Sequence, residues 1–215
     1  MEGLHFIFFA DPMCSWCWGF SPTVDLLRSR YGDILPMRLV MGGLRPGTEA
    51  PMTAEAKAQM RGYWAKVAQV RGQPFDDRAL EAEDFAYDTD PGARAVVLAR
   101  RTSEDAGLDY LARAQRAFYA EGRDITRYET LADLAAELGF DRDAFLSGLS
   151  EDALRQETWR DYAISQRAGV TGFPTLIIGP KADGTYAMVS RGYNGAAEIV
   201  GAIDALLATA KPAVH

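Results

Sequence analysis

Uninterrupted apolar runs near both ends of the chain predict strands, and amphipathic patterns between them predict helices. Residues 3–10 are almost wholly apolar, which predicts a strand that is covered on both faces. Residues 34–41 predict a second strand. Between them, apolar positions at helical spacing predict a helix over about 15–31 that contains Pro22. A strand, a helix and a strand in this order are typical of a parallel pair joined by a crossover.

The middle of the chain, from about residue 50 to residue 168, repeats its apolar residues at helical spacing and is predicted to be all helical. Local start and stop signals divide this part into separate helices. The signals are an N-cap at Thr53, a cap at Asp90 followed by Pro91, a break at Gly107, and a capping box that runs from Thr126 to Glu129.

Strand patterns return after Gly169. Residues 175–179 and 186–189 are apolar and flank an Asp183-Gly184 pair, which predicts a hairpin. Asn194 is expected to cap a final helix. The complete order predicts an α/β fold with four strands and an all-helical insertion between the second and third strands.

Composition and charge exclude some classes of function. The chain has 215 residues and a formal net charge of −7, which argues against nucleic acid or an anionic membrane as the main partner. The chain has no stretch of 18 apolar residues, so no membrane span is expected. The first residues lack the basic start and the cleavage site of a signal peptide, so a cytoplasmic protein is expected.

The only two cysteines of the chain are Cys14 and Cys17, which follow the first predicted strand and open the first predicted helix. Unpaired N–H groups and the positive end of the helix dipole favour a thiolate at such a position. A thiolate attacks disulfides, and a second cysteine one turn along can then release the product. The spacing therefore predicts a thiol–disulfide redox pair.

Two other interpretations of the cysteine pair carry less weight. A structural disulfide between positions 14 and 17 would close a very small loop and would constrain little of the chain. A closed zinc site would need carboxylates or both histidines, because the chain has no third cysteine and only His5 and His215. We therefore expect no metal.

The element order and three sequence segments resemble the DsbA family, whose members have a thioredoxin-like fold with a helical insertion. Pro22 lies eight residues after Cys14, where thioredoxin-like helices often carry a proline. Residues 169–175 resemble the G-V-x-G-x-P-T loop of that fold, which ends in a cis-proline beside the active site. Residues 11–19 and 118–125 resemble the FrnE-like branch, a relative of 2-hydroxychromene-2-carboxylate isomerases and kappa-class glutathione transferases.

The resemblance implies a domain division and a set of site residues. Residues 1–45 and 169–215 would form the thioredoxin-like domain, and residues 46–168 the insertion. The protein would exchange disulfides with a thiol or disulfide substrate, without a dissociable cofactor and with glutathione as a candidate redox partner. The implied catalytic residues are Cys14 as nucleophile, Cys17 as resolving thiol and Pro174, and the implied substrate-binding residues are Ser15, Trp16, Thr171 and Phe173.

The chain departs from the family pattern in its proton acceptor. Many relatives place a buried carboxylate six residues before the first cysteine, and here that position is Phe8. Asp11 and, less directly, His5 are the nearest candidates. We expect Asp11 to cap the turn before the helix, and His5 to be a satisfied core or edge residue.

Several questions stay open at the level of sequence. A glutathione-dependent transferase or isomerase, and a non-enzymatic adaptor like the SpxH-like relatives, are the alternative functions. The oligomeric state and the reduction potential are not determined. Among the aromatic residues near the cysteines, Trp18 and Phe20 are expected to be packed, and the pairs Arg28/Arg30 and Arg100-Arg101 are expected on solvated helix faces.

Overall fold

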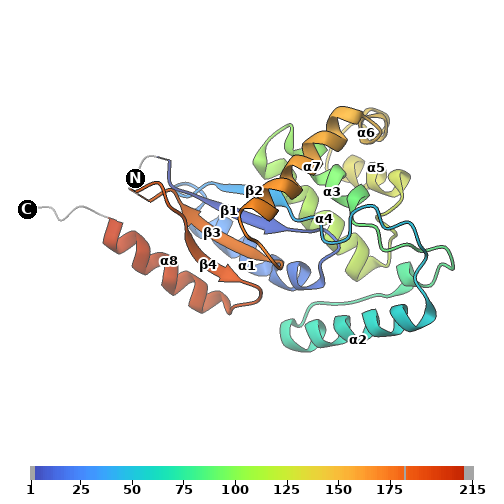
Figure 1. Cartoon of the computed structure of the whole chain (residues 1–215), viewed down its shortest axis with the longest axis horizontal. Helices are drawn as coiled ribbons and strands as arrows, with labels where there is room; N and C mark the ends of the chain where they lie inside the picture. The colour runs from blue at the N-terminus through green and yellow to red at the C-terminus, as the bar shows by residue number, and fades with distance from the viewer. Residues whose placement is uncertain (1–2, 182, 211–215) are drawn as a thin grey trace, which may run out of the picture.

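The computed structural model describes residues 3–181 and 183–210, and its centre is a four-stranded mixed sheet (Figure 1). The strand order is β2-β1-β3-β4, with β1 parallel to β2 and antiparallel to β3, and β3 antiparallel to β4. The predicted α/β fold is therefore confirmed, including the hairpin and the parallel first pair. The strands are β1 (His5–Ala10), β2 (Met37–Met41), β3 (Thr175–Gly179) and β4 (Ala187–Arg191).

Helix α1 (Ser15–Tyr31) joins β1 to β2 and passes through Pro22 without a break. Helix α8 (Ala196–Ala210) follows β4. A helical insertion separates β2 from β3, as predicted. It contains α2 (Ala54–Arg71), the short 3-10 helix η1 (Arg78–Leu80), α3 (Asp90–Arg100), α4 (Glu104–Glu121), α5 (Tyr128–Glu137) and α6 (Arg142–Leu149), and α7 (Asp152–Arg167) leads into β3.

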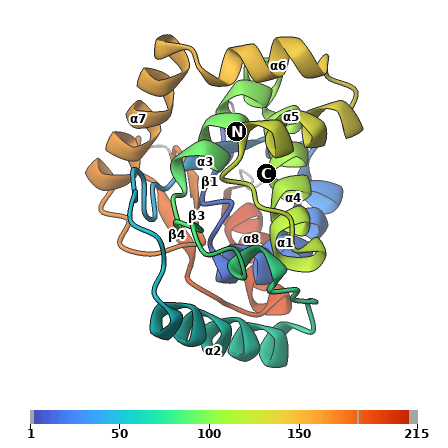
Figure 2. The same ribbon diagram turned by 90° about the vertical axis from the view of Figure 1, so that its right-hand side faces the viewer.

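Helices cover the two faces of the sheet. Figure 2 shows α7 on one side of the strands, and α1 and α4 on the other. Helix α8 lies beside α1, and the Tyr31 hydroxyl of α1 donates to an Asp204 oxygen of α8 at 2.6 Å. Helix α2 packs against the start of α1, where a Cβ at Gly19 would come within 3.0 Å of Val67, and its Trp64 ring contacts the Tyr119 ring of α4 with centroids 5.1 Å apart. No helix of the described part is long and apolar enough to span a bilayer.

Strand β1 runs through the middle of the core. Phe6, Phe8 and Ala10 on one face of β1 and Phe9 on the other are at most 2% exposed, and β1 has a hydrogen-bonded neighbour on each side. Phe8 stacks on Phe20 of α1 with ring centroids 6.0 Å apart. Burial on both faces explains the uninterrupted apolar pattern. The chain leaves the carboxyl end of β1 at Ala10, and the first turn of α1 follows there.

Two predicted helix signals are wrong, and at the first of them a tertiary contact gives the residue another role. Helix α4 begins after Ser103, whose side chain accepts from the Ala106 N–H, and Gly107 lies inside the helix. A Cβ at Gly107 would lie 2.8 Å from Cβ of Arg100, so this glycine permits the close approach of α3 and α4. The residue is a packing glycine rather than a helix stop.

The capping box at Thr126 is also absent, since α5 begins at Tyr128 and the Thr126 N–H and hydroxyl both donate to Asp124.

The other predicted caps lie at or near the observed helix starts. The cap of α3 is Thr89, one residue earlier than predicted. Asn194 precedes α8, and its side chain bonds Ser190 and Glu198. The N-cap at Thr53 is confirmed, because its side chain accepts from the Ala56 N–H.

Insertion side chains bond three backbone groups on the outer edge of β2. Asp161 of α7 accepts from the Met41 N–H at 2.9 Å, and Arg100 of α3 donates to the Leu39 carbonyl. Glu104 of α4 accepts from the Leu39 N–H at 3.0 Å. Arg100 is mostly buried and also pairs with Asp161, so its prediction as a solvated residue is wrong. An edge strand leaves N–H and C=O groups unpaired, and here three helices supply their partners.

We predict that Asp161→Ala lowers the free energy of unfolding by about 3 kcal/mol, since it leaves the mostly buried Arg100 charge without its carboxylate and the buried Met41 N–H without an acceptor. Urea-induced unfolding measures the change. The matched control is Asp133→Ala, which removes a half-exposed ion pair with Arg142 and is expected to cost less than about 1 kcal/mol. Equal losses in the two variants would contradict the proposed role of Asp161.

Candidate active site

The turn between β1 and α1 makes Cys14 the N-cap of α1. The Cys14 backbone is extended (φ −93°, ψ 112°), and its carbonyl accepts from the Trp18 N–H at 3.0 Å. The Cys14 Sγ accepts from the Cys17 N–H at 3.4 Å. The sulfur therefore occupies the place of a capping oxygen, where unpaired N–H groups and the helix dipole favour negative charge.

A distant loop completes the surroundings of this sulfur. The Cys14 Sγ lies 3.5 Å from the Phe173 carbonyl oxygen, to which its thiol donates. The Phe173–Pro174 peptide bond is cis, as the sequence resemblance implied. Pro174 is buried and directly precedes β3. The structure thus brings Cys14, Cys17, Phe173 and Pro174 together from the two ends of the chain.

The two cysteines differ in exposure, and burial acts on the thiol of Cys17. Both thiols are free, and Cys14 is 7% exposed whereas Cys17 is 1% exposed. Burial raises the pKa of the Cys17 thiol well above its usual value, and the hydrogen bond with Cys14 raises it further. Cys17 therefore keeps its proton at neutral pH. Both cysteines are buried, and Cys14 is the less buried of the two.

Asp11 holds the turn that precedes the cysteines. Its carboxylate accepts from the Met13 N–H and from the Leu44 N–H, each at 2.9 Å. The side chain therefore caps the turn, as expected, and also ties it to the segment after β2. Asp11 is fully buried, and burial raises the pKa of this carboxyl to about 6.

His5 lies at the opposite end of β1 from the cysteines. Its Nδ1 is 2.6 Å from the Gly3 carbonyl oxygen and its Nε2 is 3.4 Å from the Tyr186 hydroxyl. It is a satisfied, buried residue, as expected. Across residues 3–181 and 183–210, no three His, Cys, Asp or Glu side chains are grouped as metal ligands. His215 lies outside these residues.

The loop after β2 packs against the loop that contains Phe173 and Pro174. A Cβ at Gly42 would lie 2.2 Å from the Phe173 ring, so the ring packs directly on the backbone at this position. Gly43 has a φ of +69° and faces the Tyr162 ring of α7 in the same way. Only glycine fits at these two positions, which explains the Gly42-Gly43 pair in the sequence.

Trp16 lies between the two cysteines in sequence and packs against Tyr193, a residue from a distant part of the chain. It is half-buried and stacks on Tyr193, with ring centroids 6.0 Å apart. The Arg71 guanidinium lies 4.3 Å from the centroid of the Tyr193 ring and donates to the Tyr193 hydroxyl. Arg71 also donates to the Gly19 carbonyl at 2.6 Å. Tyr193 and Arg71 were not predicted, since nothing local in the sequence relates them to Trp16.

Two tyrosines of the insertion reach the same turn. Trp18 is buried, as expected, and stacks on Tyr119 of α4 with ring centroids 6.3 Å apart. The hydroxyl groups of Tyr119 and Tyr87 lie 3.3 Å apart, and the Tyr87 hydroxyl donates to the Met13 carbonyl at 2.6 Å. Sequence reasoning missed these contacts, although Tyr119 lies in the segment 118–125 that carried part of the family resemblance.

The other two predicted substrate-binding residues lie at the edges of the site. Ser15 is the half-buried first residue of α1. Thr171 is exposed, and its hydroxyl accepts from Arg191 of β4 at 3.2 Å. This bond connects Thr171 to the edge strand. The roles of Ser15 and Thr171 stay predictions.

Comparison with known proteins agrees with this geometry. Residues 6–197 match the family described as DSBA-like thioredoxin domain. The chain belongs to this family. A protein from Nitrosomonas europaea that carries the provisional name protein disulfide isomerase is 30% identical, with a TM-score of 0.87, and the match covers 98% of this chain and 100% of that one. The fold is accordingly thioredoxin-like.

Two further relatives of this DSBA-like protein point in different directions. The cytosolic disulfide reductase DsbM from Pseudomonas aeruginosa is 28% identical with a TM-score of 0.77, covers 96% of this chain and 100% of its own, and has also been solved with GSH. The ClpXP adapter protein SpxH from Bacillus subtilis is 24% identical over 178 residues, which are 80% of this chain and 57% of SpxH. The chain thus spans a little over half the length of this relative.

We predict that Asp11 makes the stability of the protein depend on pH. The raised pKa means that the folded state favours the protonated carboxyl, so this contribution is complete below about pH 4 and is lost as the pH rises through about 6. Relative to Asp11→Asn, the free energy of unfolding of the wild type should fall by about 3 kcal/mol between pH 4 and pH 7. Chemical denaturation measures this difference in unfolding free energy between the wild type and Asp11→Asn. A difference that stays constant from pH 4 to pH 7 would disprove the raised pKa of Asp11.

Proposed function

We propose that this protein is a thiol–disulfide oxidoreductase of the reductase or isomerase type, with Cys14 as nucleophile and Cys17 as resolving thiol. The single observation that carries the proposal is the position of the Cys14 sulfur. It accepts from the Cys17 N–H at the start of α1 and faces the Phe173 carbonyl across the cis-proline loop. A sulfur at this position is favoured as a thiolate and has its partner thiol one turn away.

The reaction proceeds by two exchanges. The Cys14 thiolate attacks a substrate disulfide, forms a mixed disulfide and releases one substrate thiolate, which takes up a proton. The Cys17 thiol then loses its proton and its sulfur attacks the Cys14 sulfur, which releases the second substrate thiol and leaves a Cys14–Cys17 disulfide. Two electrons pass from the cysteine pair to the substrate.

The neighbouring groups suit a peptide or a small thiol. The Phe173 backbone and Pro174 would present their edge to the substrate, and Ser15, Trp16 and Thr171 would line its path. Glutathione is the candidate redox partner, because the DsbM relative has been solved with GSH. A cytoplasmic location agrees with the description of DsbM as cytosolic. Membership in the FrnE-like branch remains part of this proposal.

We predict that Cys14→Ser abolishes disulfide reductase activity, because it removes the nucleophile. Cys17→Ser should instead accumulate a mixed disulfide at Cys14, since the resolving thiol is absent. Reduction of insulin disulfides with glutathione as electron donor, followed by mass spectrometry of the protein, measures both effects.

Wild-type activity that survives in Cys14→Ser would disprove the proposal. Full glutathione-dependent turnover by Cys17→Ala would favour a glutathione-dependent transferase or isomerase, because such chemistry needs one sulfur only. Ser29→Ala on the exposed side of α1 is the matched control and should behave as the wild type.

An adaptor is the second candidate function, and the similarity to SpxH favours it. An adaptor would bind its partner through the insertion and would not need the cysteines. We predict that a double variant with Cys14→Ser and Cys17→Ser loses the reductase activity and also loses its stable binding partners. Specific and undiminished capture of one partner by the double variant would support the adaptor and contradict this prediction.

A further inference from the structure

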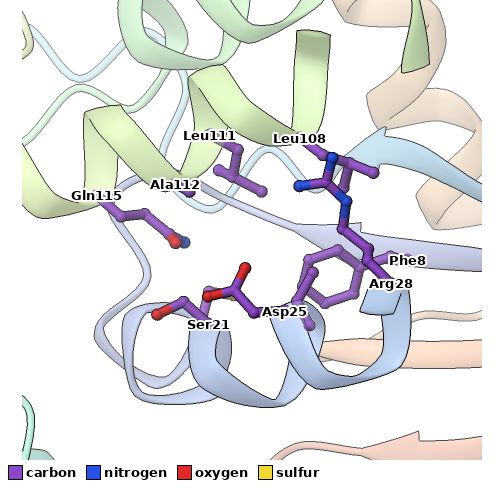
Figure 3. Close-up of a pocket in the computed structure, with 10 residues that line it drawn as sticks. Phe8, Ser21, Asp25, Arg28, Leu108, Leu111, Ala112 and Gln115 are labelled. Carbon is purple, nitrogen blue, oxygen red and sulfur yellow. The ribbon is translucent and has the colours of Figure 1, made fainter. Parts of the chain in front are cut away.

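A small cavity lies behind the cysteine pair, between α1 and α4 (Figure 3). Its volume is about 10 Å³, which is close to the space that one water molecule needs. The α1 side includes Cys17, Ser21 and Asp25, which follow one another at intervals of four residues and so share one face of the helix. The remaining wall consists of Phe8, Val24, Arg28, Leu108, Leu111, Ala112 and Gln115.

Gln115 is the polar residue of the α4 wall. It is 2% exposed, and its Nε2 has no hydrogen-bond partner among the described residues. An amide nitrogen has two protons to donate, and leaving a buried donor unpaired costs about 1–3 kcal/mol. Figure 3 shows the Gln115 side chain extending from α4 toward α1, on the side where Ser21 and Asp25 lie. A water molecule in the cavity would satisfy this nitrogen.

Cys17 needs a route for its proton, because its sulfur attacks only as a thiolate. The thiol is 1% exposed, and burial holds its pKa high. Phe8 on the β1 side of the cavity has no group that accepts a proton. Asp11 also acts on Cys17, but its carboxyl is fully buried and offers the proton no direct exit to solvent. The cavity adds a polar path that leads from Cys17 toward an exposed carboxylate.

We infer that Gln115 holds a water molecule against Cys17 and that this water begins a hydrogen-bonded path, past Ser21, along which the Cys17 proton reaches Asp25 and then solvent. The inference rests on the proposed function and concerns its second exchange. In that step the Cys17 S–H bond breaks and the proton enters the water beside Gln115, from which it moves past Ser21 to the Asp25 carboxylate. The Cys17 sulfur bonds to the Cys14 sulfur as the substrate thiolate departs. Gln115 is a positioning residue, and Asp25 is the proton acceptor.

The charges around this path are few. Asp25 is exposed, and Arg28 is the cation nearest to it along the same face of α1. Arg28 pairs with Asp105 and Asp109 of α4 at 3.0 and 2.7 Å. From the β1 side, Asp11 is the other titratable group that acts on Cys17. The pH dependence of the second exchange is therefore expected to involve Cys17, Asp25 and Asp11.

The two exchanges are measured separately in one mixing experiment with dithiobis(nitrobenzoate). Attack by Cys14 releases a first thionitrobenzoate, and attack by Cys17 on the mixed disulfide releases a second. In Gln115→Leu and in Asp25→Asn the first release should keep the wild-type rate. The second should be about tenfold slower near pH 7, less than the hundredfold of a directly bonded proton acceptor, since residual water still reaches the thiol.

The slowing should disappear at high pH, where hydroxide removes the Cys17 proton directly. Gln115→Glu places a carboxylate in the cavity and should restore the second release at neutral pH. The matched control is Asp33→Asn, which removes an exposed carboxylate outside the cavity and should leave both releases unchanged.

Each remaining outcome overturns a stated part of the inference. A second release at the wild-type rate in Gln115→Leu or in Asp25→Asn removes that residue from the path. Slowing by the same factor at every pH, or slowing of the first release, means that the residue acts through packing alone. These results leave the proposed function intact. If the wild type itself gives no second release, the proposed function fails instead.

Discussion

The hydrogen bond from the Cys17 N–H to the Cys14 sulfur is the interaction on which the rest of the site depends. The first N–H groups of a helix need acceptors, and a neutral thiol is a weak one. The same group becomes a stronger acceptor when it is charged, so the need of the helix is met best by a thiolate. Strand β1 makes this possible, because its burial between β2 and β3 fixes where α1 begins.

The insertion does more than extend the molecule. It closes the edge of β2 through Arg100, Glu104 and Asp161, and it holds the turn before Cys14 through the Tyr87 hydroxyl. Helix α4 also covers the inner side of Cys17. Residues of the sheet and of the insertion belong to one hydrophobic cluster. Without α4, Cys17 would lose apolar neighbours that contribute to its burial, and burial is what raises the pKa of its thiol most.

Local signals predicted local features well. The apolar run of β1, the Thr53 cap and the Asp183-Gly184 hairpin are determined by neighbours in the sequence, and all three are present. Two of the errors occur at residues that have a distant partner. Gly107 and Arg100 have conventional local meanings, a helix stop and a solvated charge, but the packing of α3 against α4 and β2 assigns them others.

The sequence by itself determined the order of the elements, the position of the cysteine pair at a helix start and the family resemblance of residues 169–175. These follow from spacing and from residue type, which act over a few positions. Only the tertiary structure decided that Phe173 faces Cys14, that Tyr193 and Arg71 flank Trp16, and that Gln115 lies behind Cys17. Such contacts join residues far apart in the chain, and their geometry depends on how whole helices and strands pack.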